Sequence, residues 1–457
     1  MLPPLVPKPS FLLGNAKQIS NNPVPFLRDC SNKYGSLFRI TVVGREFYVL
    51  DASNKEGFAE LVQNESMSLM LGGLNTMRFD CYLRNGAAIH SEGRNAILLR
   101  SHFQSTELDA LAPKTYRMAT QYLRTRIQST NGLERNVSDL SLSLVAVMSA
   151  HGFLGDILSR NEQVVEIFKT FFLHAEWIAA LTTLLPSWLV PVVIFFFLPL
   201  HTCKQRMRLL LIPEIKRRRR KNDKEQEQDL LQLLVDGEPD NETVVTQVLL
   251  LIIAAMRNTS IALNNLFYEL AGDEGLMEAL RDEIVGVIGE DEDPLLTRVN
   301  LGKMVLLDSV IRESLYQNAK PISTVRTAWQ DTMLLGFHIP KGSNLLVFGA
   351  NLHGRSYWDE PEELFEPRRW IGTGKHSTST SADFVAFGGG KTICPGRLFG
   401  MLELKTVLSS CMLNFKMSLR AGYVMPKKEF SMKHVLPRAL ANGTETPILF
   451  TPSNESS

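Results

Sequence analysis

A short glycine-rich stretch, FGGGKTICPG at 387–396, joins residues of two kinds of chemistry. Its Gly-Lys-Thr at 390–392 is typical of a phosphate-binding loop, whereas Cys394 before a Pro-Gly pair has the setting of a metal ligand. A phosphate loop needs a glycine five residues before the Gly-Lys-Thr, and that position is Val385. The spacing therefore disfavours phosphate binding and favours a thiolate ligand.

The residues around Cys394 suit a flat metal cofactor. Glycines at 388–390 let the backbone lie close to such a ligand. An amphipathic helix is predicted over 395–414, and the N–H groups at its start would stabilise a negative charge on sulfur. A single protein thiolate suits an iron that a macrocycle already holds.

Four residues, Phe387, Gly390, Cys394 and Gly396, match the pattern F-x-x-G-x-x-x-C-x-G. The stretch thus resembles the haem-thiolate signature of the cytochrome P450 family. The resemblance implies that Cys394 is the axial ligand of a haem iron and that the other three residues bind the cofactor.

Further segments resemble the same family and occur in its order. FEPRRW at 365–370 is similar to the segment upstream of the cysteine, and IPKG at 339–342 is similar to the turn before it. AMRNTS at 255–260 falls where the family has its oxygen-activating motif, on a long central helix. The stretch 3–14 resembles the proline-rich entry, and 153–162 resembles fungal members related to terpenoid oxidases.

The oxygen-activating motif departs from the family at one position. By resemblance, Asn258, Thr259 and Ser260 are the candidate catalytic residues, but Asn258 replaces an acid. An amide can hold a water yet cannot relay a proton by ionising. The two hydroxyls can deliver protons through ordered water, or they are bonded back to the preceding turn.

A second departure lies in the family's Glu-x-x-Arg, which here is ESLY with Tyr316 in the place of the arginine. A buried Glu313 must then pair with Arg369 or Arg312, be protonated, or bond to Tyr316.

A third departure concerns charge beside the cofactor. Thr392 stands where the family usually has a cation for a haem propionate. By resemblance, Arg326 sits where the family often places such a cation, and Arg94 or Arg100, from an early helix, could supply the other. The alternative for the last two is solvation at the surface.

The elements that position these residues are mostly helical. Apolar alternation over 37–43 and 46–50 predicts a hairpin, and 333–335 and 344–348 are strand-like. The polar stretch 373–382 is predicted to be a loop. These patterns predict one domain that is mainly α with a minor β part. The resemblance implies a single cytochrome P450-type domain over 1–457, with a long central helix over the haem and the cysteine loop beneath. Helical patterns cover 105–130, 137–153, 160–181, 203–221, 242–270 and 301–315.

Composition limits the partners. The chain has 457 residues with 49 basic and 48 acidic side chains, so no overall field favours nucleic acid. We expect a monomer without a nucleic-acid partner. The five cysteines are scattered without a C-x-x-C pair, which indicates a reducing compartment, and the four besides Cys394 are predicted to be small buried hydrophobes.

Two segments bear on membranes. The first residues show neither a secretory signal nor an anchor. The segment 177–200 is uncharged but holds three prolines, so we expect no single straight spanning helix. It either covers the substrate or dips into one leaflet. The basic run 216–221 is expected to be a solvated helix end, with lipid head groups or a redox partner as the alternative.

The resemblance implies a monooxygenase that inserts one oxygen atom of O2 into a lipophilic, terpenoid intermediate of fungal secondary metabolism. Electrons would come from NADPH through NADPH-cytochrome P450 reductase, at the cytosolic face of the endoplasmic reticulum membrane. The candidate substrate-facing segments, 252–255, 321–325 and 177–200, are apolar. Asn258 favours one alternative, an isomerase or dehydratase that needs no reductase. Tyr316 suggests the other, a non-catalytic binding protein.

Overall fold

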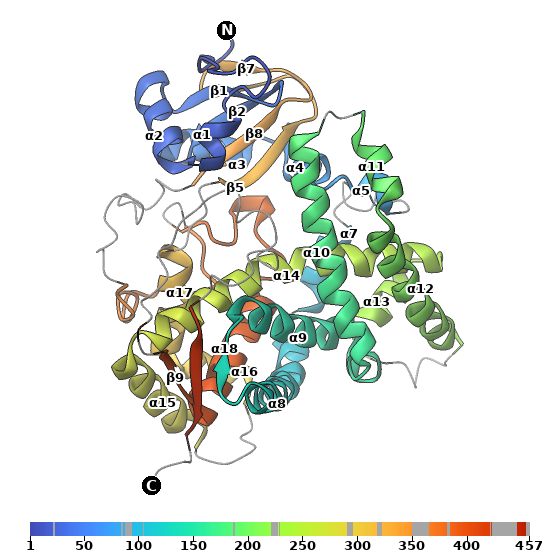
Figure 1. Cartoon of the computed structure of the whole chain (residues 1–457), viewed down its shortest axis with the longest axis vertical. Coiled ribbons are helices and arrows are strands. Elements are labelled where there is room, and N and C mark those ends of the chain that lie inside the picture. Colours follow the sequence, from blue (N-terminus) through green and yellow to red (C-terminus); the bar gives the residue numbers. More distant parts are fainter. Residues whose placement is uncertain are drawn as a thin grey trace.

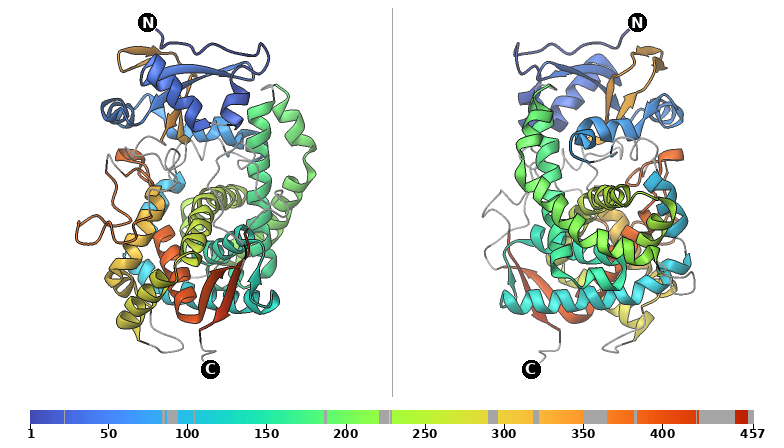
Figure 2. Two further views of the ribbon diagram at one scale, coloured as in Figure 1. Left: turned by 60° about the vertical axis from the view of Figure 1, so that its left-hand side comes forward. Right: turned by 90° about the vertical axis from the view of Figure 1, so that its right-hand side faces the viewer.

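The main sheet lies at one end of the molecule, with the N-terminus and the helices α1–α3 (Figure 1). Long helices, with β9 and β10 among them, make up most of the rest, as two further views show (Figure 2). The architecture is thus mainly α with a minor β part, as predicted. In this computed structural model the described residues are 1–21, 23–83, 86, 94–103, 105–185, 188–220, 227, 229–289, 296–317, 322–349, 365–381, 384–420, 422 and 446–453.

The main sheet joins distant parts of the chain. Strands β1 (Leu37–Val42) and β2 (Arg45–Asp51) form the predicted hairpin. Its two-residue turn has positive φ at Val43 and Gly44, as a type I′ turn requires. Strand β2 pairs in parallel with β8 (Asn344–Phe348), and β5 (Ile322–Ala328) and β3 (Met67–Ser68) complete the order β1-β2-β8-β5-β3.

Two smaller sheets and the helices complete the fold. One sheet has the order β4-β10-β9 and the other pairs β6 with β7. Their strands are β4 (Leu133–Glu134), β6 (Thr332–Leu334), β7 (Phe337–Ile339), β9 (Phe415–Leu419) and β10 (Ile448–Pro452). The helices are α1 (Ala16–Asn21), α2 (Pro23–Tyr34), α3 (Lys55–Gln63), α4 (Leu69–Met77), α5 (Phe79–Tyr82), α7 (Arg94–His102), α8 (Ser105–Ser129), α9 (Val137–Ser159), α10 (Glu162–Leu184), α11 (Val190–Phe196), α12 (Leu198–Arg219), α13 (Leu230–Gly237), α14 (Asn241–Ala271), α15 (Glu274–Ile288), α16 (Arg298–Lys303), α17 (Val305–Gln317) and α18 (Arg397–Asn414).

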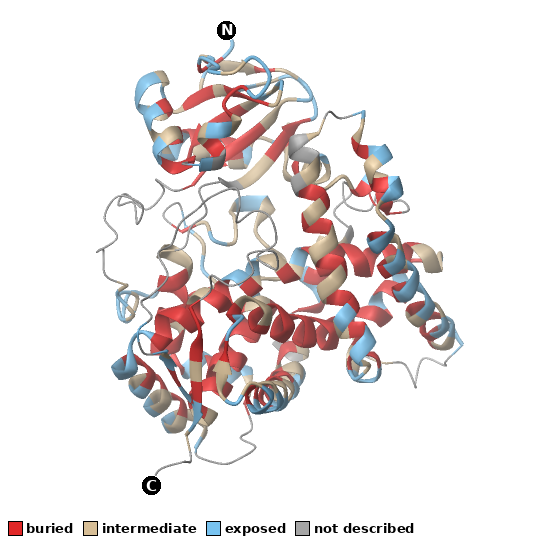
Figure 3. Cartoon of the chain, in the orientation of Figure 1, coloured by how far each residue is buried: buried red, intermediate tan, exposed pale blue. Residues whose placement is uncertain are grey.

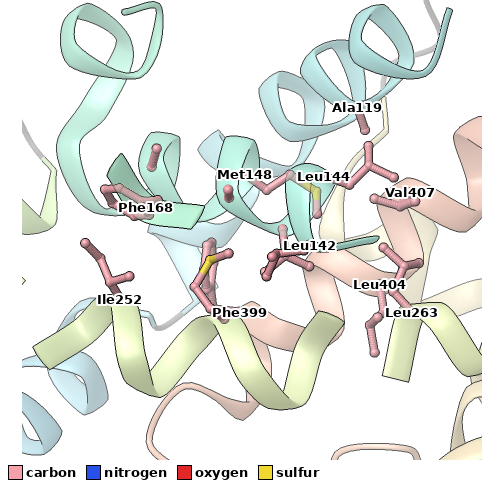
Figure 4. Close-up of a cluster of buried hydrophobic side chains, with 14 of the residues drawn as sticks. Ala119, Leu142, Leu144, Met148, Phe168, Ile252, Leu263, Phe399, Leu404 and Val407 are labelled. Carbon is pink, nitrogen blue, oxygen red and sulfur yellow. The ribbon is translucent and has the colours of Figure 1, made fainter. Parts of the chain in front are cut away.

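Helix α14 runs through the interior, as its largely apolar sequence predicts. Asp240 caps it by accepting a hydrogen bond from the backbone N–H of Thr243. Buried residues are concentrated where α14 packs on α9 and α18 (Figure 3). Each buried Leu, Ile or Phe in this cluster stabilises the fold by about 1.5–3 kcal/mol. Labelled members are Leu142 and Met148 of α9, Ile252 and Leu263 of α14, and Phe399 and Leu404 of α18 (Figure 4).

The uncharged segment 177–200 is not one helix. Helix α10 ends at Leu184, and α11 and α12 start anew with a proline in the first turn of each. The prediction that prolines interrupt this segment is therefore confirmed. Pro186 lies outside the described residues.

Two helices in the described part of the chain are long and apolar enough to cross a membrane, α9 and α14. In both, most of the apolar stretch is buried inside the fold, 78% for α9 and 67% for α14. Their apolar character is accounted for by packing in the core.

The basic run at the end of α12 matches the prediction of a solvated helix end at Lys216, Arg219 and Arg220, which are exposed, but not at Arg218. Arg218 is almost fully buried, and its guanidinium binds Glu214 and Asp229. Arg219 donates to the backbone carbonyl of Val235, 3.0 Å away. The run ties α12 to α13 because these carboxylates and carbonyls lie beside it.

Candidate active site

The loop before α18 is closed by its own backbone. The N–H of Cys394 donates to the carbonyl of Phe387 at 2.8 Å, and Phe387 itself is partly buried against the main core. Gly390 has φ +56°, and a Cβ there would stand 2.7 Å from Val62 Cγ1 of α3. Glycine at 390 therefore serves the turn and the close approach to α3.

Burial and the start of α18 act on the Cys394 thiol in opposite directions. Burial raises the pKa of the thiol, while the backbone N–H groups of Gly396 and Arg397 and the charge of Arg397 act to lower it. Gly396 is the N-cap of α18, so the helix begins two residues later than predicted. The start of α18 therefore lies next to Cys394 in the chain, and its N–H groups oppose the effect of burial on the thiol.

Arg326 brings a buried positive charge to this loop. Its guanidinium donates to the Thr392 hydroxyl at 2.9 Å and to the Met67 carbonyl at 3.1 Å. Burial lowers its pKa, and no carboxylate binds it among the described residues. Its Nε also lacks a partner there. A buried cation without a counter-ion is costly, so this site suits an anion such as a haem propionate.

The two early arginines fare differently. Arg100 of α7 donates to the carbonyl of Lys391 at 2.8 Å and so reaches the same loop. Arg94 begins α7, but its side chain lies outside the described part. Both remain predictions as propionate partners.

Helix α14 is open along one strip at the level of the oxygen-activating motif. Ala254, Asn258 and Ile261 are exposed on a helix that is otherwise mostly buried, and their spacing places them on one face. Thr259 lies against α18, since a Cβ on Gly400 would be 3.7 Å from its Oγ1. The hydroxyl of Ser260 donates back to the Arg257 carbonyl at 3.2 Å. Of the two hydroxyl alternatives, Ser260 shows the bond to its own helix.

A charged pair borders this strip. Arg257 binds the carboxylate of Glu176 on α10, with N–O distances of 2.9 and 2.8 Å. Glu176 is buried, so the pair fixes the direction of the Arg257 side chain beside Asn258.

A family model described as Cytochrome P450 matches residues 3–441. The chain belongs to the cytochrome P450 family. The predicted resemblance is confirmed over nearly the whole chain, and family membership implies a haem with a thiolate-bound iron. The described residues fit that cofactor in three ways. Cys394 stands at the start of α18, the buried charge of Arg326 has no carboxylate partner among the described residues, and α14 is exposed along one strip.

Relatives of this P450 include enzymes from animals and fungi. Lanosterol 14-alpha demethylase of Mus musculus is 28% identical over 458 residues, which cover 94% of this chain and 85% of the relative. Cytochrome P450 monooxygenase olcJ of Penicillium canescens is 29% identical over 335 residues, which cover 68% of this chain and 62% of the relative. A solved structure, the retinoic acid bound cyanobacterial CYP120A1, has a TM-score of 0.70 at 20% identity and 99% coverage of both chains. The chain is therefore an oxidoreductase with the P450 fold.

In this P450 the carboxylate of Glu313 on α17 is fully buried. It has hydrogen-bond donors around it even though residue 316 is a tyrosine and not the arginine of the family. The carboxylate accepts hydrogen bonds from Arg369 Nε at 3.0 Å, from the Trp370 indole N–H at 2.9 Å and from the Gln317 side chain at 2.9 Å. A fourth comes from the backbone N–H of Glu366 at 3.3 Å. The alternative in which Arg369 is the charge partner is the one the structure shows.

Sequence reasoning missed Gln317 and Glu176, and it named Trp370 only as part of FEPRRW, without its contact to Glu313. Gln317 lies four residues after Glu313 on one helix, a spacing that brings side chains together and could have been noticed. Trp370 and Glu176 come from other segments, and no local pattern announces their contacts.

Proposed function

We propose that this P450 inserts one oxygen atom of O2 into a lipophilic, terpenoid-like substrate of secondary metabolism. Electrons would pass from NADPH through NADPH-cytochrome P450 reductase. The observation that carries the proposal is the position of Cys394 in a closed loop at the start of α18, with the buried Arg326 bound to the same loop. When bound, the haem supplies the activation of dioxygen.

The protein's own residues would hold the cofactor from two sides. Cys394 would bind the iron, and the N–H groups of Gly396 and Arg397 would keep its sulfur charged. Arg326 would pair with one propionate, with Arg100 or Arg94 beside the other.

On the α14 side, Thr259 is the residue best placed to pass a proton. Its hydroxyl is not among those bonded back to the helix in the described part, unlike that of Ser260. Asn258 is exposed on the open strip and would hold a water by its amide. Neither step needs the acid that the family has at 258.

The substrate class rests on apolar surface and on relatives. Ile252 and Ile253 of α14 are buried, and Ala254 opens onto the strip. The start of the segment 321–325 lies outside the described residues. One relative is named for lanosterol, a lipophilic isoprenoid. Together these favour a terpenoid or steroid scaffold.

Attachment to the endoplasmic reticulum would use an exposed apolar surface. We define the apolar tip as Phe11, Leu12, Trp188, Phe195 and Phe196, all strongly exposed. Its two halves are tied together, because Arg45 beside the N-terminal segment donates to the Leu185 carbonyl at 2.7 Å. An apolar surface of this kind fits a lipid boundary.

The test has two stages. Purified protein, reduced and exposed to carbon monoxide, should show a thiolate-ligated haem, and Cys394→Ser should lose that signature while Cys411→Ser keeps it. Coexpression with a reductase and terpenoid, steroid or polyketide candidates should then give a product one oxygen heavier by mass spectrometry. A normal spectrum in Cys394→Ser would refute the assignment of Cys394 as the ligand of the haem iron. Product formed from a peroxide without NADPH would select the isomerase alternative.

A further inference from the structure

The segment between α17 and the cysteine loop is held by side chains rather than by a sheet. Residues 365–381 form turns, with one isolated bridge at Ser381, and they lead to Phe384 and then to the loop at 387–396. Helix α17 binds this segment through Asp308, Ser309, Arg312 and Glu313. Of these four, Arg312 is the residue that also contacts Phe384, from which the chain enters the cysteine loop.

Arg312 binds the C-terminal part of this segment. It is almost fully buried, and its Nη1 donates to the backbone carbonyls of His376 and Ser379, the second at 3.0 Å. Its guanidinium carbon lies 3.7 Å from the ring centre of Phe384 and 4.6 Å from that of Trp370. Carbonyl binding together with stacking on two rings is a use of guanidinium geometry that lysine cannot copy.

Glu313 and Tyr316 contact the N-terminal part of this segment at Trp370. The indole N–H of Trp370 donates to Glu313, and the Tyr316 ring packs edge-on against the indole at 5.3 Å. With Arg312, and with Ser309, whose hydroxyl accepts the Trp370 backbone N–H at 3.2 Å, four residues of α17 thus contact one tryptophan of the segment.

The carboxylate of Glu313 has no room for a further donor. A carboxylate offers about four acceptor positions, and Glu313 already accepts four hydrogen bonds. Arg369 also lies over the Tyr316 ring at 5.7 Å. An arginine at 316 would place a second cation beside Arg369 with no acceptor left, so the aromatic ring fits this position better.

We propose that Arg312 is the positioning residue that sets the cysteine loop, in place of the arginine that the family has at position 316. Its contact with Phe384 fixes the chain three residues before Phe387. The carbonyl of Phe387 in turn accepts the N–H of Cys394. Displacing Phe384 therefore displaces the backbone partner of the thiolate ligand. The inference rests on Cys394 being the haem ligand.

The test compares Arg312→Met with Arg281→Met. Arg281 is a matched control because it also binds two backbone carbonyls, those of Met412 and Leu413, each at 2.8 Å, but at the far end of α18. Both variants lose charge-assisted hydrogen bonds and should lower the melting temperature. Arg312→Met alone should reduce the thiolate-ligated fraction of reduced, carbon-monoxide-bound protein by about tenfold, the effect of one to two such bonds.

A second measurement, amide hydrogen exchange, uses protein without the haem. In haem-free protein, Arg312→Met should speed amide hydrogen exchange across 365–381 and leave exchange in α15 unchanged. Arg312→Lys should give an intermediate thiolate fraction, and it replaces Arg312→Met if that variant does not fold. Tyr316→Arg should also lower the fraction.

The outcomes separate the inference from the proposed function. If wild-type protein never shows thiolate ligation, the function fails, whatever the exchange data show. If wild type shows it and Arg312→Met or Arg312→Lys keeps it in full, the positioning role is refuted. Equal losses in the Arg312 and Arg281 variants would also refute it, because the effect would then be general destabilisation.

Discussion

Arg326 holds its charge in the interior beside a hydroxyl and backbone carbonyls. A charge placed there without a counter-ion destabilises the empty protein and should stabilise the loaded one. Removing the charge of Arg326 should therefore stabilise the haem-free protein and destabilise the haem-bound protein.

We expect Arg326→Met to raise the free energy of unfolding of haem-free protein by about 1–3 kcal/mol and to speed haem loss at least tenfold. Urea unfolding and haem transfer to apomyoglobin measure the two effects. Arg45→Met is the control, because that arginine binds a carbonyl far from the loop. A destabilised haem-free variant would contradict the idea that the charge is uncompensated.

Glu403 is a second buried ionisable group near the centre. Its carboxyl group accepts a hydrogen bond from Ser149 at 2.8 Å, and its other oxygen has no partner among the described residues. Burial raises its pKa well above the ordinary value, so the folded protein keeps a proton that the unfolded chain releases. Stability is then greatest below the unfolded pKa and falls as pH rises toward the folded one.

We expect Glu403→Gln to remove this slope, which is at most about 1.4 kcal/mol per pH unit. The variant should match wild type near pH 4 and exceed it in stability at pH 8. Urea unfolding measured between these values tests it. Parallel profiles for the two proteins would show that Glu403 is ionised in the folded state.

Fixed spacing made the central residues of the site predictable. Cys394 and its glycines follow a local pattern, and Arg326 was inferred from the missing cation at Thr392, which it contacts. The partners of Glu313 and the pairing of Arg257 with Glu176 depend on segments far apart in sequence. Sequence patterns within one segment do not predict contacts between distant segments, so these contacts are found only in the folded structure.

At the scale of elements, helix α4 presses directly on strand β5. Gly72 makes this possible: a Cβ there would lie 2.1 Å from the Val325 carbonyl oxygen and 2.9 Å from the Cα of Arg326. The absence of a side chain at one position thus sets the distance between an element and the strand that carries a site residue.

Gly72→Ala should destabilise the protein by about 1–3 kcal/mol and weaken haem retention, since the strand must move. Gly286→Ala is the control. It lies in α15 with nothing within 4 Å of an added Cβ and should stabilise by up to about 1 kcal/mol. Denaturant unfolding compares them, and a neutral Gly72→Ala would mean that α4 shifts freely.

Helices with strong apolar periodicity were predicted within a few residues, as α8 and α14 show. Helix α9 kinks at Gly155, whose φ of +76° is not helical, close to its predicted end at 153, and a second helical stretch follows to Ser159. A side chain at Gly155 would also collide with Asp229. Helix α15 was not predicted, although Asp273 caps it and Gly289 follows it. Strand β5 was missed because its pairing partners lie outside any local window.

At the scale of the whole molecule, the residues of the apolar tip come from two places, the N-terminal segment and α11 with the residue Trp188 before it. Binding to a membrane through these residues would fix the orientation of the protein on it.

Replacing Phe195 and Phe196 by serine should weaken binding to phosphatidylcholine vesicles at least tenfold, since two phenyl groups leave the lipid boundary. Cosedimentation measures this. Ile157→Ser is the control, because that residue is equally exposed but lies on α9. If both variants bind like wild type, the tip is not the attachment surface.

The parallel pairing of β2 with β8 has a consequence for how the protein is made. Strand β8 follows β2 by about 290 residues, which a ribosome adds in roughly 15–60 s. During that time β1 and β2 can form their hairpin, but the other edge of β2 stays unpaired and open to other chains. Slowing synthesis between these strands should therefore increase aggregation in the cell, even though the finished protein is unchanged.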